Sequence, residues 1–165
     1  MDFLMILMFG ISICPALLLI KILDRNKENK QKKKQRGKEE EDQIFVTNAL
    51  IIMAKVMAAD RTNMVCELDI IKQFIKKYDE ANFKKQVNYV KELASKYKNP
   101  VDTTLSDCDR LITDINEVSN FTRKKWFLEY LFEIAFSDGS CSAEEKLFLK
   151  RVVEKLDGFD LSTYN

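Results

Sequence analysis

Apolar residues recur at spacings of three and four along most of the chain, which is the period of an amphipathic helix. The segment NALIIMAKVMAA, residues 48–59, is apolar almost all round and predicts a helix buried on every side. Further apolar stripes lie at about residues 67–78, 83–97, 105–115, 126–135 and 149–156. No segment reads better as a strand, and only four glycines and two prolines interrupt the chain. The pattern therefore predicts an all-α bundle over residues 43–160.

Part of the chain matches itself when it is shifted by the separation of Asp60 from Asp138, and the same shift places Glu67 on Glu145. Apolar positions on both flanking helices also coincide. They are Leu50 with Leu128, Met53 with Leu131, Val56 with Ile134, Met57 with Ala135, Ile70 with Phe148, Ile71 with Leu149, Phe74 with Val152, and Ile75 with Val153. The repeat predicts two pseudo-symmetric helix hairpins, with the intervening helices completing the bundle.

The N-terminus carries an uncharged apolar run, FLMILMFGISICPALLLI, at residues 3–20. With Lys21 able to extend its ammonium to the interface and two more apolar residues beyond it, the run can cross a hydrocarbon core of about 30 Å. A signal peptide needs positive charge before the apolar run, but only Met1 and Asp2 stand there. We therefore predict an uncleaved transmembrane anchor over residues 1–23, which contacts the lipid bilayer through residues 3–23.

Charge is distributed unevenly around this anchor. Nine Lys/Arg face three Asp/Glu up to Lys38, whereas 18 face 23 from Glu39 onward. Basic residues that follow a span stay in the cytoplasm, so we expect the N-terminus outside and the body inside. Residues 24–42 are predicted to be a disordered, charged linker. Its basic residues are expected to attract anionic lipid headgroups, through Lys30, Lys32, Lys33, Lys34, Arg36 and Lys38.

The composition excludes several classes of function. The chain has no histidine, which removes Ser-His-Asp and Cys-His catalysis and histidine metal ligation. Its four cysteines form no CxxC pair and read as reduced thiols. The acidic body argues against nucleic-acid binding. There is no glycine-rich phosphate loop and no catalytic carboxylate pair, so we expect no catalytic residue and no enzyme activity.

An aromatic stripe and a set of lysines are each explained by the fold without a binding function. Trp126, Phe127 and Tyr130 follow helical spacing and are interpreted as core rather than as a surface for a partner. The lysines of the third stripe are interpreted as its solvated face. They include Lys84, Lys85, Lys91 and Lys96.

The acids of the second hairpin have different explanations. Ser142 and Glu145 have the spacing of a capping box, and Gly139 suits the left-handed residue that ends a helix. Asp138 instead follows a helix, where the macrodipole disfavours negative charge, and Asp60 has the same placement. Both need a compensating partner, for which loop N–H groups, a lysine or a divalent cation are the alternatives.

The two hairpins carry a family resemblance. LFEIAFSDGSCSAEEKLFLKRVV (131–153) and IIMAKVMAADRTNMVCELDIIKQFI (51–75) resemble the paired hairpins of TerB-like (tellurite-resistance) domains. The resemblance covers roughly residues 43–158. The order of membrane helix, basic linker and TerB-like domain also resembles the N-terminal part of membrane-anchored co-chaperones of the DjlA type. The His-Pro-Asp motif of their J-domain cannot occur in a chain without histidine.

The resemblance implies a metal site built from Asp60, Glu67, Asp138 and Glu145, although Arg61 stands where the second hairpin has Gly139. We expect a cytoplasmic interaction or scaffolding module, anchored in the bacterial inner membrane. It would bind a protein partner in envelope or tellurite-type metal stress. The alternative is a regulatory module that binds a divalent cation through the paired acids. A hydrolase using an acid-bound metal is a third alternative, without an evident nucleophile or base.

Overall fold

The computed structural model describes residues 34–59, 64–97 and 100–159, of which residues 100–106 are described by their backbone alone. It groups the chain into two units, Met1–Glu40 and Glu41–Asn165. We refer to the second as the helical unit. The predicted anchor and the basic residues up to Lys33 lie outside the described residues.

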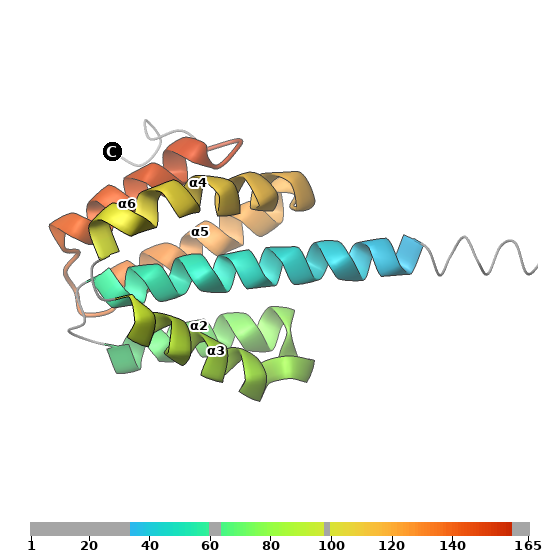
Figure 1. The fold of residues 1–165 in the computed structure, drawn as a ribbon, viewed down its shortest axis with the longest axis horizontal. Helices are drawn as coiled ribbons and strands as arrows, with labels where there is room; N and C mark the ends of the chain where they lie inside the picture. Colours follow the sequence, from blue (N-terminus) through green and yellow to red (C-terminus); the bar gives the residue numbers. More distant parts are fainter. Residues whose placement is uncertain (1–33, 60–63, 98–99, 160–165) are drawn as a thin grey trace, which may run out of the picture. The chain divides into compact units, whose positions relative to one another are not determined.

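Among the described residues all regular structure is helical, without strands. In chain order the elements are the N-terminal helix Lys34–Ala59, α2 Met64–Tyr78, the 3₁₀ turn η1 Glu80–Asn82, α3 Phe83–Lys96, α4 Pro100–Val118, α5 Phe121–Ala135 and α6 Ala143–Lys155. Helix α2 packs on α3 and α5, and α6 packs on α4 and α5. Within the helical unit, the N-terminal helix runs between the α2–α3 pair and the α4–α6 pair (Figure 1). The prediction of an all-α fold is confirmed.

The N-terminal helix supplies the centre of the core. Its side chains from Phe45 to Met57 are almost all buried, and those of Phe45, Leu50, Met53 and Val56 are fully buried. The predicted burial of residues 48–59 is thus confirmed on nearly every side, with only Ile51 and Ala59 partly exposed. Lys34–Ala59 is also long and apolar enough to cross a membrane by length and composition. In the helical unit its apolar side chains pack against the neighbouring helices.

An aromatic cluster joins the N-terminal helix to α2 and α5. The Phe45 ring lies 6.0 Å from the Phe74 ring, 5.4 Å from the Tyr78 ring and 6.4 Å from the Phe127 ring, measured between centroids. Edge-to-face and tilted arrangements of this kind add to the free energy that burial alone provides. The cluster therefore holds together helices that are far apart in the sequence.

Both predicted hairpins form, the first from the N-terminal helix and α2 and the second from α5 and α6. The apolar pairs that the repeat aligned are buried in both copies, except that Ile70 is half-buried where Phe148 is buried. Equivalent positions of the two hairpins are therefore buried in the same core, which explains why the same helix faces are apolar in both.

The N-terminal helix begins earlier than the sequence pattern predicts. Residues 34–42, predicted to be part of a disordered linker, are helical. They are rich in Lys, Arg, Gln and Glu, which have high helix propensity, and they place acids four residues after bases, as in Arg36 and Glu40. Extending a helix that is already nucleated costs little, so these exposed turns continue from the buried ones.

One ion pair ties α4 to α6. Arg151 donates from Nε to Asp109 Oδ1 over 3.0 Å and from Nη2 to Asp109 Oδ2 over 2.6 Å, and Lys155 Nζ lies 3.7 Å from the same carboxylate. The hydrogen bonds from Arg151 lower the pKa of Asp109 below its ordinary value. The charged form is therefore favoured in the folded state.

Asp109→Asn is expected to lower the free energy of unfolding at neutral pH by up to about 1 kcal/mol, because the pair is partly exposed. A carboxyl group whose folded pKa is depressed stabilises the fold above its unfolded pKa of about 4, and this stabilisation is lost as pH falls through the folded value. The difference between wild type and variant in urea unfolding should thus be present at pH 7 and fade below about pH 4. A difference independent of pH would contradict this account.

Candidate functional site

The loop between α5 and α6 is closed by Asp138. Its Oδ1 accepts hydrogen bonds from the Ser140 backbone N–H over 2.9 Å and from Ser140 Oγ over 3.0 Å. These bonds lower the pKa of the exposed Asp138 carboxyl group. Gly139 lies between the two residues with φ of +85°, in the left-handed region that its missing side chain allows. The loop itself thus provides a compensating partner for the acid at the helix end.

Glu145 is held by the start of α6. Its Oε2 accepts from the Ser142 N–H over 2.8 Å, while its own N–H donates to Ser142 Oγ over 3.2 Å. This is the predicted capping box, which is confirmed. The Glu145 side chain is 1% exposed, so its hydrogen bond to the Ser142 N–H is buried and stabilises the end of the loop.

Ser142→Ala is expected to cost about 1 kcal/mol of unfolding free energy, because the N–H of Glu145 loses its acceptor. Guanidinium denaturation followed by far-UV circular dichroism measures the change. Ser95→Ala is the matched control, since Ser95 is exposed near the end of α3 and donates only to the Glu92 carbonyl. Equal costs for the two variants would show that the cap contributes nothing beyond an ordinary surface serine.

The first hairpin shows only part of the corresponding arrangement. Asp60 and Arg61 lie outside the described residues. Glu67 lies in the first turn of α2 and is 2% exposed. The two glutamates aligned by the repeat are therefore both buried at the start of the second helix of their hairpin, and both are partnered. Burying a carboxylate costs free energy unless it is hydrogen-bonded or paired. Each hairpin must therefore keep a partner in place for its buried glutamate.

The predicted metal ligands differ in their surroundings. Asp138 is exposed, whereas Glu67 and Glu145 are buried, and Glu145 points an oxygen at the Ser142 N–H. The described residues contain no group of three or more Asp, Glu, Cys or His side chains arranged to hold a metal ion. Asp60 lies outside that range, so the four-residue site stays a prediction.

None of the three described cysteines forms a disulfide; Cys66 is exposed, and Cys108 and Cys141 are buried. Burial raises the pKa of the Cys108 thiol to about 12, although the nearby Lys55 charge acts against this. Lys55 is itself 3% exposed, and its Nζ lies 5.1 Å from the centroid of the Tyr97 ring. Reactive cysteines have a lowered pKa and an accessible thiol, and the buried Cys108 has neither feature.

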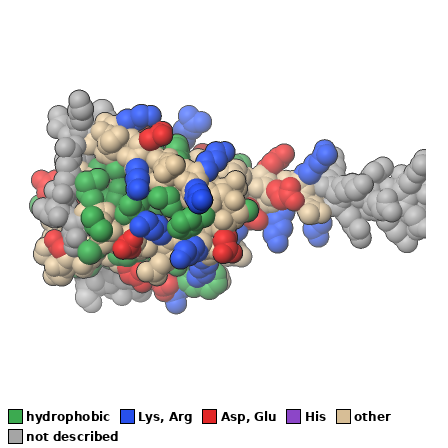
Figure 2. All heavy atoms as spheres, turned by 90° about the horizontal axis from the view of Figure 1, so that it is seen from below, with side chains coloured by type: hydrophobic (Ala, Val, Ile, Leu, Met, Phe, Trp, Pro, Cys, Tyr) green, Lys and Arg blue, Asp and Glu red, His purple; other side chains and the backbone are tan. Residues whose placement is uncertain are grey.

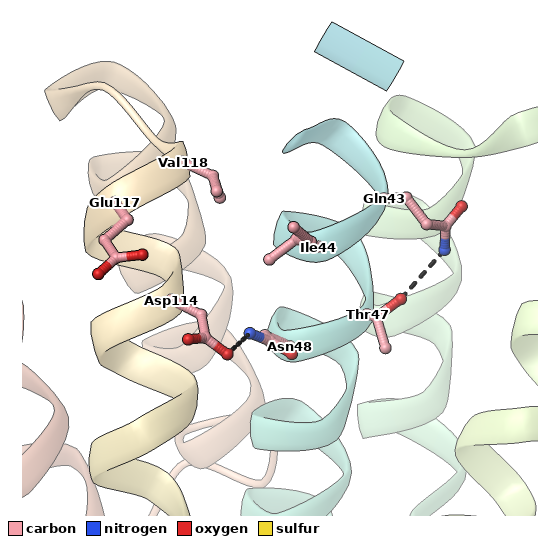
Figure 3. Close-up of a pocket in the computed structure, with 7 residues that line it drawn as sticks. All are labelled: Gln43, Ile44, Thr47, Asn48, Asp114, Glu117 and Val118. Carbon is pink, nitrogen blue, oxygen red and sulfur yellow. Dashed lines mark hydrogen bonds between the residues drawn. The ribbon is translucent and has the colours of Figure 1, made fainter. Parts of the chain in front are cut away.

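A shallow polar cleft of about 340 Å³ lies between the N-terminal helix and α4 (Figure 3). Within it Asn48 Nδ2 donates to Asp114 Oδ2 over 3.1 Å, and Gln43 Nε2 donates to Thr47 Oγ1 over 3.0 Å. The other lining residues are Ile44, Glu117 and Val118. The Asn48 bond sets the register between the two helices. The cleft offers amide and carboxylate groups and contains neither a thiol nor a lysine.

Trp126 is more exposed than its helical spacing predicts. Phe127 is fully buried and Tyr130 half-buried as expected, but Trp126 is 38% exposed. Lys77 Nζ lies 3.6 Å from the centroid of the Trp126 ring, a close cation–π contact. Trp126 falls at the edge of the apolar stripe of α5, where helical spacing alone does not separate buried from exposed positions. The proximity of Lys77, from α2, is invisible in the sequence.

Comparison with known proteins agrees with this architecture. The chain matches the family described as tellurite resistance protein TerB over residues 47–159, which spans the described helices from the buried part of the N-terminal helix to the end of α6. Searches of curated proteins and of solved structures find no match. The match covers more than half of the chain and both hairpins, and we conclude that the chain belongs to the TerB family.

Proposed function

We propose that the protein is a membrane-anchored interaction module, whose TerB-family unit is held at the cytoplasmic face of the bacterial inner membrane by residues 3–23. The observation that supports this most directly is the extent of the family match. It covers residues 47–159 and leaves before it an 18-residue uncharged run followed by a basic segment. That order is typical of a single-pass anchor whose following domain stays in the cytoplasm.

The basic segment is proposed to contact anionic lipid headgroups. Lys34, Arg36 and Lys38 are exposed on the first described turns of the N-terminal helix, and Lys30, Lys32 and Lys33 precede them in the sequence. Basic residues close to an anionic surface each contribute about 1 kcal/mol to the attraction. In this proposal they increase the affinity for the membrane beyond what the anchor alone provides.

In this proposal the module binds a protein partner and does not catalyse a reaction, and its physiological setting is envelope stress or tellurite-type metal stress. The chain lacks histidine, the Cys108 thiol is kept protonated, and the acids at the second loop are engaged in turn and cap formation. These features favour a binding role over the metal-dependent hydrolase alternative.

Membrane fractionation tests the anchor. The full chain is expected to stay with inner membranes after carbonate extraction, and a chain lacking residues 1–23 is expected to appear in the soluble fraction with a helical circular dichroism spectrum. Protease added to intact spheroplasts should leave the helical unit uncut, and protease added to inverted vesicles should digest it. A full chain extracted by carbonate, or a unit cut in spheroplasts, would contradict the proposal.

Divalent-cation binding is the second candidate function. It is favoured by the acid repeat, in which Glu67 and Glu145 occupy the same buried position in the two hairpins, and by Asp138, whose pKa is lowered in the loop that precedes Glu145. Carboxylate oxygens are the ligands that Ca²⁺ and Mg²⁺ prefer. Occupancy of this region would change how the two loops pack, and hence which partner the module selects.

Thermal unfolding of residues 39–165 with Ca²⁺, Mg²⁺, Mn²⁺ or Zn²⁺ tests this candidate. A cation at a hundred times its Kd should stabilise the fold by about 2.7 kcal/mol and raise Tm by roughly 10 °C. Asp138→Asn should abolish the rise. Asp157→Asn, which changes an exposed acid just after α6, should preserve it. No rise with any of the four ions, or equal loss in both variants, would exclude a cation site at Asp138.

A further inference from the structure

The chain enters the helical unit at a defined end of the bundle. Asp42, one of its first residues, pairs with Arg123 in the first turn of α5. The Arg123 guanidinium carbon lies 4.9 Å from the centroid of the Phe45 ring, which in turn contacts Tyr78 at the end of α2. The segment before Glu41 is therefore joined to the unit beside the end of α2 and the start of α5. Figure 1 shows the turn between α2 and α3 at this same end.

The surface at this end combines lysines with aromatic rings. Lys77 Nζ lies over Trp126 at 3.6 Å, and Lys76 Nζ lies 5.7 Å from the centroid of the Phe83 ring. Lys76, Lys84 and Lys85 also border a shallow hollow of about 580 Å³ around the η1 turn. We call this surface the tether-end face, and its residues are Lys76, Lys77, Phe83, Lys84, Lys85 and Trp126. Figure 2 looks onto the α2–α3 side, where basic side chains stand beside both hydrophobic and acidic ones.

The acids of the connecting turn only partly offset this charge. Asp79 accepts hydrogen bonds from Asn82 Nδ2 over 2.8 Å and from Gln86 Nε2 over 2.7 Å, so it is engaged within the turn. Glu80 is exposed and borders the hollow. Four lysines thus stand against two acids, Asp79 and Glu80, on a surface that also presents an indole ring. Glu129, on the same helix as Trp126, pairs with Lys125.

We propose that the tether-end face docks the helical unit onto an anionic membrane surface. Lysines are attracted to anionic headgroups, and tryptophan favours the membrane interface, where its ring is apolar and its N–H stays hydrated. An anionic bilayer matches both kinds of group, and the tether joins the unit at this end. That this membrane is the one crossed by residues 3–23 rests on the proposed function. The docking contact itself is inferred only from residues of the helical unit.

Trp126 is the only tryptophan in the chain and reports the contact directly. The full chain is reconstituted into phosphatidylcholine vesicles, with or without phosphatidylglycerol, that carry bromine-labelled acyl chains. We expect quenching and a blue shift of Trp126 emission in the anionic vesicles only. Lys84→Gln/Lys85→Gln should weaken the affinity of the face for anionic lipid roughly thirtyfold, at about 1 kcal/mol per lysine, measured from quenching in a titration of phosphatidylglycerol content. These exposed residues do not touch the indole, and circular dichroism checks that the fold is kept.

Lys91→Gln/Lys96→Gln is the matched control, because it removes the same charge from exposed positions nearer the other end of α3. Quenching that is equal in neutral and anionic vesicles, or an equal loss in both double variants, would overturn the proposal. So would an emission shift of the same size in vesicle-free inorganic phosphate, which would assign the face to soluble anions. Retained quenching in the control and its loss in Lys84→Gln/Lys85→Gln would support docking.

The design separates this inference from the anchor. Flotation with neutral vesicles tests residues 3–23 without help from headgroup charge. If the chain fails to float with them, the proposed anchor is wrong, and docking is then decided by flotation with anionic vesicles. In that case Lys84→Gln/Lys85→Gln should float with anionic vesicles less than wild type and Lys91→Gln/Lys96→Gln, because the basic linker still attracts it. Equal flotation of the two double variants would overturn docking.

Discussion

Phe45→Ala is expected to destabilise the helical unit by about 3–5 kcal/mol, which is most of the stability of a typical small domain. The Phe45 side chain is fully buried and its ring contacts Phe74, Tyr78 and Phe127 from two other helices. Its removal leaves a cavity at the point where the three helices meet, and it removes the aromatic contacts as well. Rigid surrounding helices can fill that space only in part.

Guanidinium denaturation of residues 39–165, followed by far-UV circular dichroism, measures this loss. Phe136→Ala is the matched control, because Phe136 is 49% exposed after the end of α5. It should cost less than about 1 kcal/mol, as exposed positions generally do. Similar midpoints for the two variants would mean that the aromatic cluster is not the structural centre described above.

Met53→Ala and Leu131→Ala are each expected to cost about 2–5 kcal/mol. The repeat aligns these two residues, and both are fully buried. Because the hairpins share one core, each substitution should shift a single transition of the whole unit. A substitution in one hairpin should therefore lower the stability of the other hairpin as well.

Two probes test this cooperativity. Trp126 fluorescence reports the contact between α2 and α5, since its ring lies 6.5 Å from the Tyr78 ring, while circular dichroism reports all helices. The two transitions should coincide in wild type and in both variants. Separate midpoints, or a Met53→Ala change that leaves the α5–α6 hairpin unaffected, would show that the hairpins fold as independent units.

The sequence predicted the helices and their buried faces well, because burial acts on residues three and four apart and leaves that period in the sequence. Ile71, Phe74 and Ile75 are buried on α2, and Val152 and Val153 on α6, as the stripes predicted. The capping box at Ser142 was equally predictable, since its partners are three residues apart and its geometry is local.

Predictions failed or stayed open where the outcome depends on distant parts of the chain. Trp126 was interpreted as core, yet it lies at an edge where α2 supplies Lys77 in place of an apolar neighbour. Lys55 sits in an otherwise apolar helix and is nonetheless buried, beside the Tyr97 ring at the end of α3. Neither environment follows from spacing along one helix.

By itself, then, the sequence determined the helical class, the two hairpins, the TerB resemblance and the cap at Ser142, all of which depend on local spacing or on a repeated pattern. Because a local loop bond, a lysine and a cation all fit the sequence around Asp138, the structure had to decide which partner it takes, and it shows Ser140 of the same loop. It also decided that the lysines at the end of α2 and the start of α3 lie with Trp126 at the end where the tether joins. The reason is physical: local hydrogen bonds and helical period are encoded over a few residues, whereas a shared surface depends on how helices distant in sequence pack together.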